Sequence, residues 1–544
     1  MAELIKAFVF VFAVSFGGFV YARLAFGEIA DGRTVARWRN VYLAATTVAF
    51  LTPNFWLFLF LLALVILLFG AGEKNRPALY LLLIFALPVA DSLVPGFGGI
   101  NGFLNLYPFN ILAVVILWPM LFARQGHRAF RRTGSTADFF FLGYSLLTFA
   151  LSFRDTTITD GFRQWTAYML TALGPYLVFS RCEWTKERLR LATLAYVTPL
   201  IILSALALVE SVMSWHLFAS PVSHWNIWHR AIYSWRSGFL RAYTTVFEPI
   251  AFGLYIATAI PLTLALLSSL KRRTLALGGL AALLVGLIVT FSRGPWVGAA
   301  FATLVFVMTS GRVFSNMTRL AGLGVAGLLV LSATPVGETI LSLLPFVGES
   351  STSSVDYRER LAEIGWDVAM ENRWLGSETY MNHPAMQQLV QGQGIIDIVN
   401  SYLRVTLESG LVGLFLFVGV SGFSVIALWR SIAKAREADP ELAVYCQAWL
   451  AALACFLLVI ATTSSVVAQV AEVHWLLCGM CVGVARSAAA AAAAKAAQPG
   501  AGPKTPAPPP PSPPKRGGPA APPGGPAARA APPHLRQYVQ RRGS

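Results

Sequence analysis

Residues 249–294 read PIAFGLYIATAIPLTLALLSSL-KRR-TLALGGLAALLVGLIVTFSRG, two apolar runs separated by three consecutive basic residues. Each run approaches the roughly 20 apolar residues that a helix needs to cross a bilayer. Basic connectors face the cytoplasm in membrane proteins, so the turn at residues 271–273 marks the inner side. The stretch therefore predicts two antiparallel membrane helices, the second of which brings Arg293 to the outer boundary of the membrane.

Similar apolar runs recur along most of the 544 residues, of which 56% are hydrophobic and only 12% charged. We therefore predict an all-α fold, a polytopic membrane helical bundle over residues 1–486 with about 12 to 15 transmembrane helices. Residues 41–71 contain Pro53-Asn54 and form either one tilted span or two short ones. The expected spans lie near residues 4–22, 41–71, 78–94, 108–123, 138–153, 165–180, 190–209, 249–270, 274–291, 296–310, 320–333, 402–429, 443–461 and 467–485.

Two polar segments interrupt or follow these spans. Residues 335–399 carry nine acidic but only three basic residues, so no positive charge holds them inside, and we expect one large extracytoplasmic loop. Residues 487–544 are rich in Ala, Pro and Gly, with eight Lys or Arg and no acid, which predicts a disordered cytoplasmic tail attracted to anionic lipids. The formal net charge of +16 collects in this tail and in the inner connectors, so it indicates membrane lipids and not nucleic acid as partners.

Three features converge on the predicted outer face. The first is Ser292-Arg293-Gly294, whose arginine is either a snorkelling interfacial side chain or an anion clamp that holds two phosphate oxygens at once. The second is the stretch from Arg241 to Glu248, at the entry to a span, where ionisable groups pair with each other or with a substrate. Aromatic residues crowd the preceding loop, and they either lie in the headgroup layer or stack on sugar rings.

The third feature is the segment 356–371 of the long loop. Its apolar side chains recur at helical spacing, which predicts a short amphipathic helix on the membrane surface. The helix carries Arg358 and Arg360, which are candidate contacts to an anion. The seven histidines of the chain include no HExxH pattern, and no carboxylates are paired at ligand spacing. We therefore expect neither a metal nor another cofactor.

These features together resemble the superfamily of O-antigen ligases and Wzy-type polysaccharide polymerases. Members combine a Ser-Arg-Gly motif at the outer end of a span, an arginine before a proline-containing span, and a large external loop. The family loop ends in His-Asn-x-x-Leu, with a glycine seven residues after the leucine. Here Val399-Asn400-Ser-Tyr-Leu403 and Gly410 occupy these positions, and the likeness runs from about Arg241 to Gly413.

Val399 departs from this pattern, because the family has a histidine there that is a proposed general base or substrate contact. Valine performs neither role. Asp397, Glu408 and His383 are the candidate replacements for proton abstraction, and their spacing does not single one out. The departure favours the polymerase branch, which makes exopolysaccharide or O-antigen, over the ligase that transfers glycan to lipid A core.

The resemblance implies a metal-independent glycosyltransferase at the periplasmic face of the bacterial inner membrane. Its donor would be an oligosaccharide on undecaprenyl diphosphate, and its acceptor either a lipid-linked repeat unit or lipid A core. Other polysaccharide assembly and export proteins are further expected partners. The implied catalytic residues are Arg293, Arg241, Arg360, Asp397 and Glu408. The implied substrate contacts are Ser292, Arg358, Glu248, Asn400 and Tyr402.

The sequence leaves some alternatives open for the roles of single residues and for the function. Arg360 or Arg358 would supply the third contact to the diphosphate. Asn400 and Tyr402 either orient sugar hydroxyls or cap and anchor the helix that begins there. A polysaccharide or lipid-linked sugar transporter or flippase is also polytopic, but it should place ionisable residues at mid-span and not at the outer boundary. A membrane scaffold without activity would explain the tail but not the three arginine-bearing features.

Overall fold

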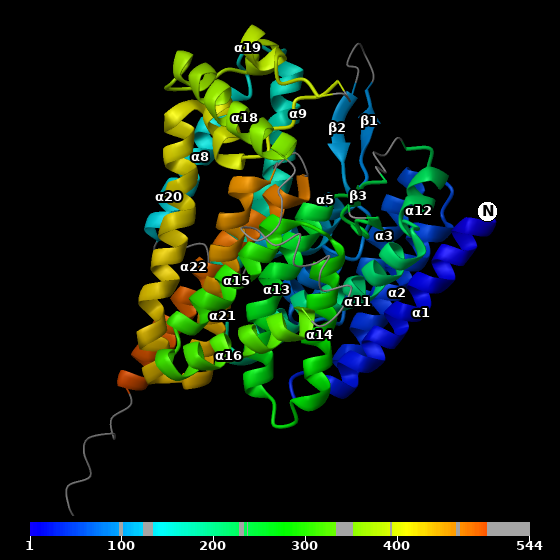
Figure 1. Cartoon of the computed structure of the whole chain (residues 1–544), viewed down its shortest axis with the longest axis vertical. Coiled ribbons are helices and arrows are strands. Elements are labelled where there is room, and N and C mark those ends of the chain that lie inside the picture. The colour runs from blue at the N-terminus through cyan, green and yellow to red at the C-terminus, as the bar shows by residue number, and fades with distance from the viewer. Residues whose placement is uncertain are drawn as a thin grey trace, which may run out of the picture. The chain divides into compact units, whose positions relative to one another are not determined.

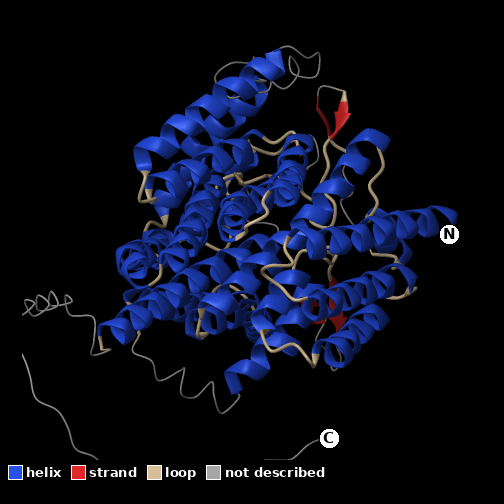
Figure 2. Cartoon of the chain, turned by 90° about the horizontal axis from the view of Figure 1, so that it is seen from below, coloured by secondary structure: helices blue, strands red, loops and turns tan. Residues whose placement is uncertain are grey.

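The computed structural model describes residues 1–96, 102–122, 134–227, 233–236, 238–332, 352–391, 394–463 and 468–497, and Figures 1 and 2 show that they are almost entirely helical. The first elements are α1 (Ala2–Ala25), α2 (Gly32–Leu51), α3 (Phe55–Gly70), α4 (Arg76–Leu83), β1 (Ser92–Pro95), β2 (Gly102–Leu106), α5 (Pro108–Leu112), η1 (Ala113–Leu117), α6 (Trp118–Phe122), α8 (Thr136–Leu151), α9 (Ile158–Tyr168), η2 (Met169–Leu173), α10 (Gly174–Arg181), α11 (Lys186–Met213) and α12 (Ala219–His224). There follow β3 (Trp235–Arg236), β4 (Phe239–Leu240), α13 (Pro249–Ser269), α14 (Thr274–Val289), α15 (Arg293–Met308), α16 (Val313–Ser332), α18 (Thr352–Glu371), η3 (Tyr380–Asn382), α19 (Pro384–Gln387), α20 (Ser401–Ala438), α21 (Pro440–Val459), η4 (Ile460–Thr462) and α22 (Ala468–Ala496).

The helices confirm the all-α polytopic membrane prediction. Six are long and apolar enough to cross a membrane, namely α1, α11, α13, α20, α21 extended by η4, and α22. Shorter apolar helices cover 55–70, 108–122, 136–151, 274–289 and 293–308. Between residues 41 and 71 the chain forms two helices, because α2 ends at Leu51, shortly before Pro53. Asn54 then caps α3 through its side chain, which accepts from the amides of Trp56 (2.8 Å) and Leu57 (3.2 Å).

Helix α13 lies in the interior of the bundle. In its most apolar part 89% of the residues are buried, against 28% in α1 and 33% in α20. It packs on α11, α14, α15 and α21. The exposed faces of α1, α3 and α20 carry large apolar side chains such as Phe10, Phe60 and Phe415. A solvent-facing apolar surface of this extent suits lipid, so the peripheral helices face the membrane and α13 faces protein.

The predicted span at residues 78–94 is wrong beyond Leu83. Helix α4 ends there, and after a turn the chain runs extended into β1. Pro88 lacks the amide that a continuing helix would need. The carbonyls freed at the helix end find side-chain donors, because the Gln469 amide donates to Ile84 O (2.6 Å) and the Thr245 hydroxyl donates to Phe85 O (2.7 Å). These bonds allow a short helix to stop inside the bundle.

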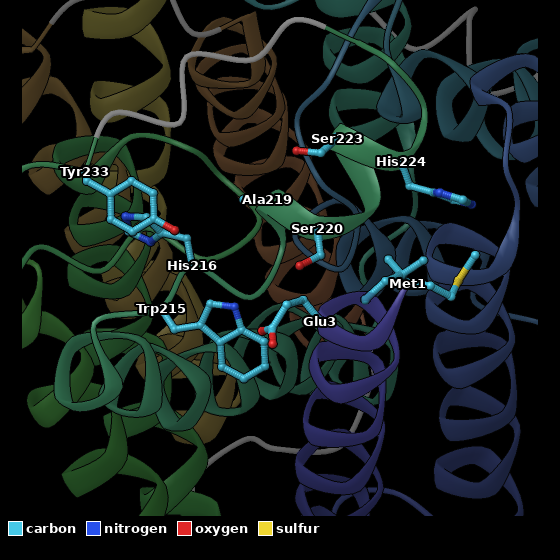
Figure 3. A pocket seen from close by; sticks show the side chains of 10 residues that line it. Met1, Glu3, Trp215, His216, Ala219, Ser220, Ser223, His224 and Tyr233 are labelled. Carbon is cyan, nitrogen blue, oxygen red and sulfur yellow. The ribbon is translucent and has the colours of Figure 1, made fainter.

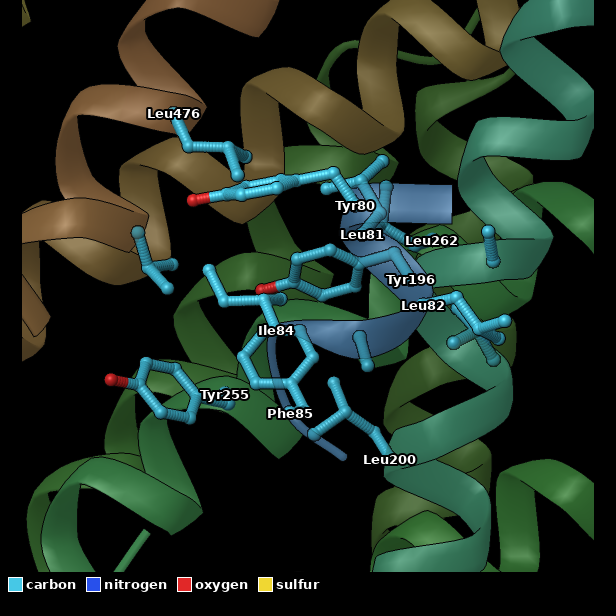
Figure 4. Close-up of a cluster of buried hydrophobic side chains, with 14 of the residues drawn as sticks. Tyr80, Leu81, Leu82, Ile84, Phe85, Tyr196, Leu200, Tyr255, Leu262 and Leu476 are labelled. Carbon is cyan, nitrogen blue, oxygen red and sulfur yellow. The ribbon is translucent and has the colours of Figure 1, made fainter. Parts of the chain in front are cut away.

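Aromatic rings surround this short helix and its turn. Figure 4 shows Tyr80, Phe85, Tyr196 and Tyr255 in one buried group, all with essentially no exposure. The centroid of the Phe85 ring lies 5.0 Å from the centroids of both Tyr196 and Tyr255. The group therefore joins α4, α11 and α13 and fixes the end of α4 beside the start of α13.

The two ends of the bundle differ in structure. We call the end at which α18 and α19 lie the loop end, and the opposite end, where residues 271–273 join α13 to α14, the turn end (Figure 1). Two antiparallel hairpins, β1–β2 and β3–β4, were not predicted from the sequence. Helix α22 continues to Ala496, past the predicted start of the tail at residue 487. Residues 335–351 and 392–393 of the predicted loop and residues 498–544 of the predicted tail lie outside the described residues.

A break in α20 fixes the polar loop against the bundle. Gly410 has φ +67° inside the helix, so the amide of Leu411 is free to donate to Arg373 O (2.7 Å), and Leu407 O accepts from Ser377 N (2.8 Å). A side chain at Gly410 would come within 2.3 Å of the Trp374 backbone. Only glycine allows both this conformation and this approach, which explains the glycine of the sequence motif.

The apolar face of α18 packs on protein and not on a membrane surface as predicted. Leu361 and Val368 are buried together with Leu403 and Leu407 of α20. The predicted helix itself is present, and it begins slightly earlier, at Thr352. Packing on α20 therefore holds α18, with its two arginines, at the loop end.

Candidate active site

The turn between α14 and α15 supplies the backbone carbonyl groups of the site. Helix α14 ends at Val289, and Phe291 adopts φ +47°, an uncommon conformation for a residue with a large side chain. The Ser292 hydroxyl donates to Thr290 O (3.0 Å), and Arg293 is the first residue of α15. The turn thus exposes the carbonyls of Thr290 and Phe291 to neighbouring donors, and two arginines bind them.

Arg241 is the first of these arginines. Its Nε donates to Thr290 O (3.2 Å) and one terminal nitrogen donates to the Ser292 hydroxyl (2.8 Å). Burial lowers the pKa of its guanidinium to about 10, an effect that the Glu248 charge opposes and the Arg236 charge reinforces. The structure therefore brings Arg241 together with Ser292, the neighbour of Arg293, and so joins two of the features that the sequence placed on one face.

Arg236 is the second, and the sequence interpretation missed it. Its Nη1 donates to Phe291 O (2.8 Å) from the β3–β4 hairpin, which pairs Arg236 with Phe239. Burial lowers the pKa of Arg236, and the charges of Arg293 and Arg358 lower it further. A Ser-Gly pair between two arginines, in Arg236-Ser-Gly-Phe-Leu-Arg241, is the signal of a tight hairpin that would have indicated their proximity.

Arg293 and Arg358 complete a group that we call the arginine cluster, namely Arg236, Arg241, Arg293 and Arg358. The Nε of Arg293 is buried and has no hydrogen-bond partner among the described residues. Arg358 lies exposed on α18, near enough to Arg236 for its charge to act there. Within the described part of the chain none of the four forms an ion pair. Cations that crowd together around neutral oxygens make a site that attracts an anion.

Two carboxyl groups border this cluster. Glu248 caps α13, where its carboxylate accepts from the amides of Ile250 (3.0 Å) and Ala251. Burial raises the pKa of Glu248, the two amides and Arg241 lower it, and the Asp397 charge raises it again. Asp397 is therefore electrostatically coupled to the residue that borders Arg241. Glu248 and Arg241, which the sequence suggested as a pair, both bind backbone groups instead of forming a close ion pair.

Asp397 is held by α18. The Tyr357 hydroxyl donates to Asp397 O (3.0 Å) and accepts from Asp397 N (3.0 Å), which fixes the backbone of this residue. Tyr357 is followed directly by Arg358. The same turn of α18 therefore contacts Asp397 and contributes Arg358 to the arginine cluster. Val399, at the family's histidine position, is a partly buried apolar residue that packs in the loop core.

Asn400 and Tyr402 act in the structure as a cap and an anchor, one of the two alternatives that the sequence left open. The Asn400 side chain accepts from the amides of Tyr402 (3.0 Å) and Leu403 (3.2 Å) at the start of α20. The Tyr402 hydroxyl donates to Leu457 O of α21 (2.8 Å). Both residues therefore position the end of the loop beside the cluster.

The remaining candidate bases have other partners. Glu408 accepts from Arg404 Nε (2.7 Å) and from the Tyr380 hydroxyl (3.4 Å). His383 Nε2 lies 3.2 Å from a Glu371 oxygen, and its Nδ1 accepts from Ala385 N (3.2 Å). Glu408 is thus bound within α20 and to η3, whereas His383 is bound between the end of α18 and the start of α19.

Arg360 is exposed and makes no hydrogen bond or ion pair within the described residues. It is two positions from Arg358, which corresponds to nearly opposite sides of a helix. No three His, Cys, Asp or Glu side chains of the described ranges gather as metal ligands do.

Comparison with known protein families gives a match. Residues 278–418 match the family model Wzy_C, described as O-Antigen ligase, which confirms the resemblance found in the sequence. The matched region begins in α14 and ends in α20, so it contains Arg293, Arg358 and Asp397, whereas Arg236 and Arg241 precede it. No curated protein matches the chain.

Proposed function

We propose that this chain, whose residues 278–418 match the O-antigen ligase family model, transfers an oligosaccharide from undecaprenyl diphosphate to a sugar hydroxyl. The observation that carries the proposal is the arginine cluster. Arg241 and Arg236 bind only neutral oxygens among the described residues, and the Nε of Arg293 has no partner there. Such a set is ready to receive a diphosphate without first breaking an ion pair.

The cluster would act on the leaving group. When the acceptor hydroxyl attacks the anomeric carbon, the bond from that carbon to the lipid diphosphate breaks and negative charge grows on the diphosphate. Preorganised donors aimed at developing charge lower the barrier in a site that excludes water. Arg293 and Arg241 are the proposed main contacts, with Ser292 and Glu248 holding the surrounding backbone, and Arg236 joins them. Arg358 is the proposed contact from α18, in preference to Arg360, because its charge acts on Arg236.

Asp397 is the proposed general base in place of the family histidine. It would take the proton from the acceptor hydroxyl as the new glycosidic bond forms. Its coupling to Glu248 and its attachment to α18 through Tyr357 support this role. Glu408 is the less favoured alternative, because its carboxylate binds Arg404 and Tyr380, neither of which belongs to the arginine cluster. Asn400 and Tyr402 would support the acceptor side of the site by fixing the start of α20.

The loop end is the proposed periplasmic side of a bacterial inner membrane. The basic turn at residues 271–273 lies at the opposite end, which would face the cytoplasm by the positive-inside rule. The tail is proposed to be cytoplasmic because its sequence is basic. On the periplasmic side the protein would meet its lipid-linked donor, its glycan acceptor and other assembly or export proteins. Membrane lipids would surround the exposed apolar helices.

Polymerisation is the favoured outcome, and lipid A core ligation is its alternative. A direct test reconstitutes the full chain in proteoliposomes and supplies only a lipid-linked repeat unit. Elongation of the glycan without lipid A core supports polymerisation. Transfer that occurs only when core is added supports the ligase, and no transfer to either acceptor would contradict the proposed function.

One buried group favours a second candidate, transport of a lipid-linked sugar. Glu472 lies inside α22, where one oxygen accepts from the Tyr80 hydroxyl and the other has no partner among the described residues. Ionisable groups at membrane depth are a mark of transport pathways. The exchange Glu472→Gln separates the two functions, since it should leave glycan transfer intact in the transferase and should abolish flipping of a labelled lipid-linked sugar in a transporter.

A further inference from the structure

A pocket of about 390 Å³ lies beside the end of α11, between α1 and α12, and the proposed reaction does not use it. Figure 3 shows His216 and Tyr233 on one side of the pocket and His224 on the other. The volume falls within the roughly 300–1,000 Å³ of ligand sites in proteins. The side chains on which the inference rests are Trp215, His216, Ser220 and Tyr233.

His216 supplies the main indication of a missing ligand. The residue is only 1% exposed, and its Nδ1 lies 3.4 Å from a Glu210 oxygen. An imidazole nitrogen that donates to a carboxylate leaves the other nitrogen as an acceptor. That Nε2 atom is buried and has no hydrogen-bond partner among the described residues. Since buried polar atoms are rarely left unpaired, a donor such as a hydroxyl of a ligand is expected there.

Glu210 holds the histidine in place. Its carboxylate also accepts from the amides of Leu217 (3.0 Å), Thr244 (3.0 Å) and Tyr243 (3.4 Å). The His216 ring stacks on Tyr243, with centroids 3.7 Å apart and planes 14° apart. The orientation of the imidazole is therefore set before any ligand binds, which reduces the cost of recognition.

The rest of the lining suits a sugar. Tyr233 is 49% exposed, and its ring centroid lies 4.7 Å from that of His216. Trp215 adds a second aromatic side chain, and Ser220 adds a hydroxyl. Flat apolar rings next to hydrogen-bonding groups match the two surfaces of a pyranose, its C–H faces and its hydroxyls. Among the described residues the lining includes the Glu3 carboxylate but no arginine or lysine, in contrast to the arginine cluster, so this lining does not favour phosphate.

The pocket and the arginine cluster share one segment of chain. Arg241 N donates to Ser234 O (2.9 Å), which places Arg241 across from the neighbour of Tyr233. Tyr243, on which His216 stacks, follows Arg241 by two residues. We propose that the pocket is a sugar-binding subsite for a neutral glycan, adjacent to the site of the diphosphate. This assignment rests on the proposed function, and the glycan belongs either to the donor or to the acceptor.

The test measures binding of a lipid-free glycan to the full chain in detergent. The probe is the oligosaccharide repeat released from its lipid by mild acid, and saturation-transfer NMR gives the dissociation constant. Tyr233→Ala removes one aromatic face. His216→Phe retains a ring against Tyr243 but removes the Nε2 acceptor together with the Nδ1 contact to Glu210. Each variant should weaken binding about tenfold, the effect of losing one good contact. Trp366→Ala is the control, because Trp366 is 48% exposed on α18 and does not line the pocket.

Equal binding by all variants, or no binding by the wild type, would overturn the subsite. Glycan transfer by the same wild-type preparation is measured in parallel. If transfer occurs and the pocket variants bind glycan normally, the subsite alone fails, whereas absence of transfer refutes the proposed function whatever the pocket binds. Inhibition kinetics then assign the pocket. If the free oligosaccharide competes with the lipid-linked donor at a fixed acceptor concentration, the pocket binds the donor glycan. If it competes with the acceptor at a fixed donor concentration, the pocket binds the acceptor glycan.

Discussion

The guanidinium of Arg241 donates to the Ser292 hydroxyl at 2.8 Å, across 51 positions of sequence. The bond ties the segment that enters α13 to the turn that begins α15, and it places Arg241 beside Arg293. The two arginine-bearing features that the sequence showed separately thus form one site. Because the partners of Arg241 are neutral, its positive charge stays available to a ligand.

The lowered pKa of Arg241 predicts how anion affinity depends on pH. An exposed arginine keeps its proton far above pH 10, but burial brings the pKa of Arg241 to about 10, so the cluster loses positive charge as the pH rises through that value. Affinity for geranyl diphosphate, whose own titration is complete at lower pH, should fall between pH 9 and 11 in calorimetric titrations. Arg241→Gln should bind more weakly and lack this inflection. Unchanged wild-type affinity up to pH 11 would contradict the interpretation.

The two arginines of α18 should behave differently. Arg358→Ala should raise the KM for the lipid-linked donor by about tenfold, because one cationic contact to the diphosphate is lost. Arg360→Ala should leave this KM unchanged, since Arg360 lies two positions from Arg358, on nearly the opposite side of the helix. Steady-state kinetics with a fluorescent lipid-linked repeat unit measure both values. A larger effect at Arg360 than at Arg358 would show that α18 presents its other side to the substrate.

Replacing each carboxylate with its amide distinguishes the roles of Asp397 and Glu408. Asp397→Asn should lower kcat by about 10²- to 10⁴-fold with little change in donor KM, as expected when a general base is removed. Glu408→Gln should retain most of kcat but lower the melting temperature, because Arg404 loses its ion-pair partner. The pair of kcat values decides the assignment, and a severe loss of kcat only in Glu408→Gln would reverse it.

Gly410 and Gly422, both in α20, provide a matched test of the loop attachment. Gly410→Ala forces a side chain into φ +67° and against the Trp374 backbone, so it should destabilise the fold by about 2 kcal/mol or more. Gly422→Ala meets no atom within 4 Å and should be neutral or slightly stabilising, as alanine is in helices. Thermal unfolding followed by tryptophan fluorescence compares the two variants. Equal melting temperatures of the two variants would mean that the stability of the fold does not depend on the helix break at Gly410.

Hydropathy and charge placement were enough to predict the membrane helices, because a span must satisfy its backbone internally and must be apolar along its length. The same reasoning failed at residues 84–94. There the bonds from Thr245 and Gln469 replace the helix, and such long-range partners leave no local signal in sequence. The packing of α18 on α20 was missed for the same reason, since an amphipathic face does not specify whether lipid or protein covers it.

The candidate site was predictable to the extent that it follows from topology. Arg241 lies just before α13, and Ser292 and Arg293 lie between α14 and α15, so all three are at the ends of these helices away from the turn at residues 271–273. Their convergence could therefore be expected before the structure. Arg236 was not expected, because its contribution depends on the fold of a hairpin within an aromatic loop. The pocket beside His216 likewise depends on Glu210, a residue of α11 whose contacts are set by tertiary packing.

Glycan transfer by Arg293→Ala tests the central claim most directly. The variant and the wild type are reconstituted at equal amounts in proteoliposomes with a lipid-linked repeat unit, and Arg312→Ala, an exposed arginine at the turn end, serves as the control. The account predicts that Arg293→Ala inserts and folds normally but loses transfer by at least about 100-fold, as enzymes do when a donor to developing charge is removed, while Arg312→Ala transfers like the wild type. Transfer at the wild-type rate by folded Arg293→Ala would contradict the role of the arginine cluster.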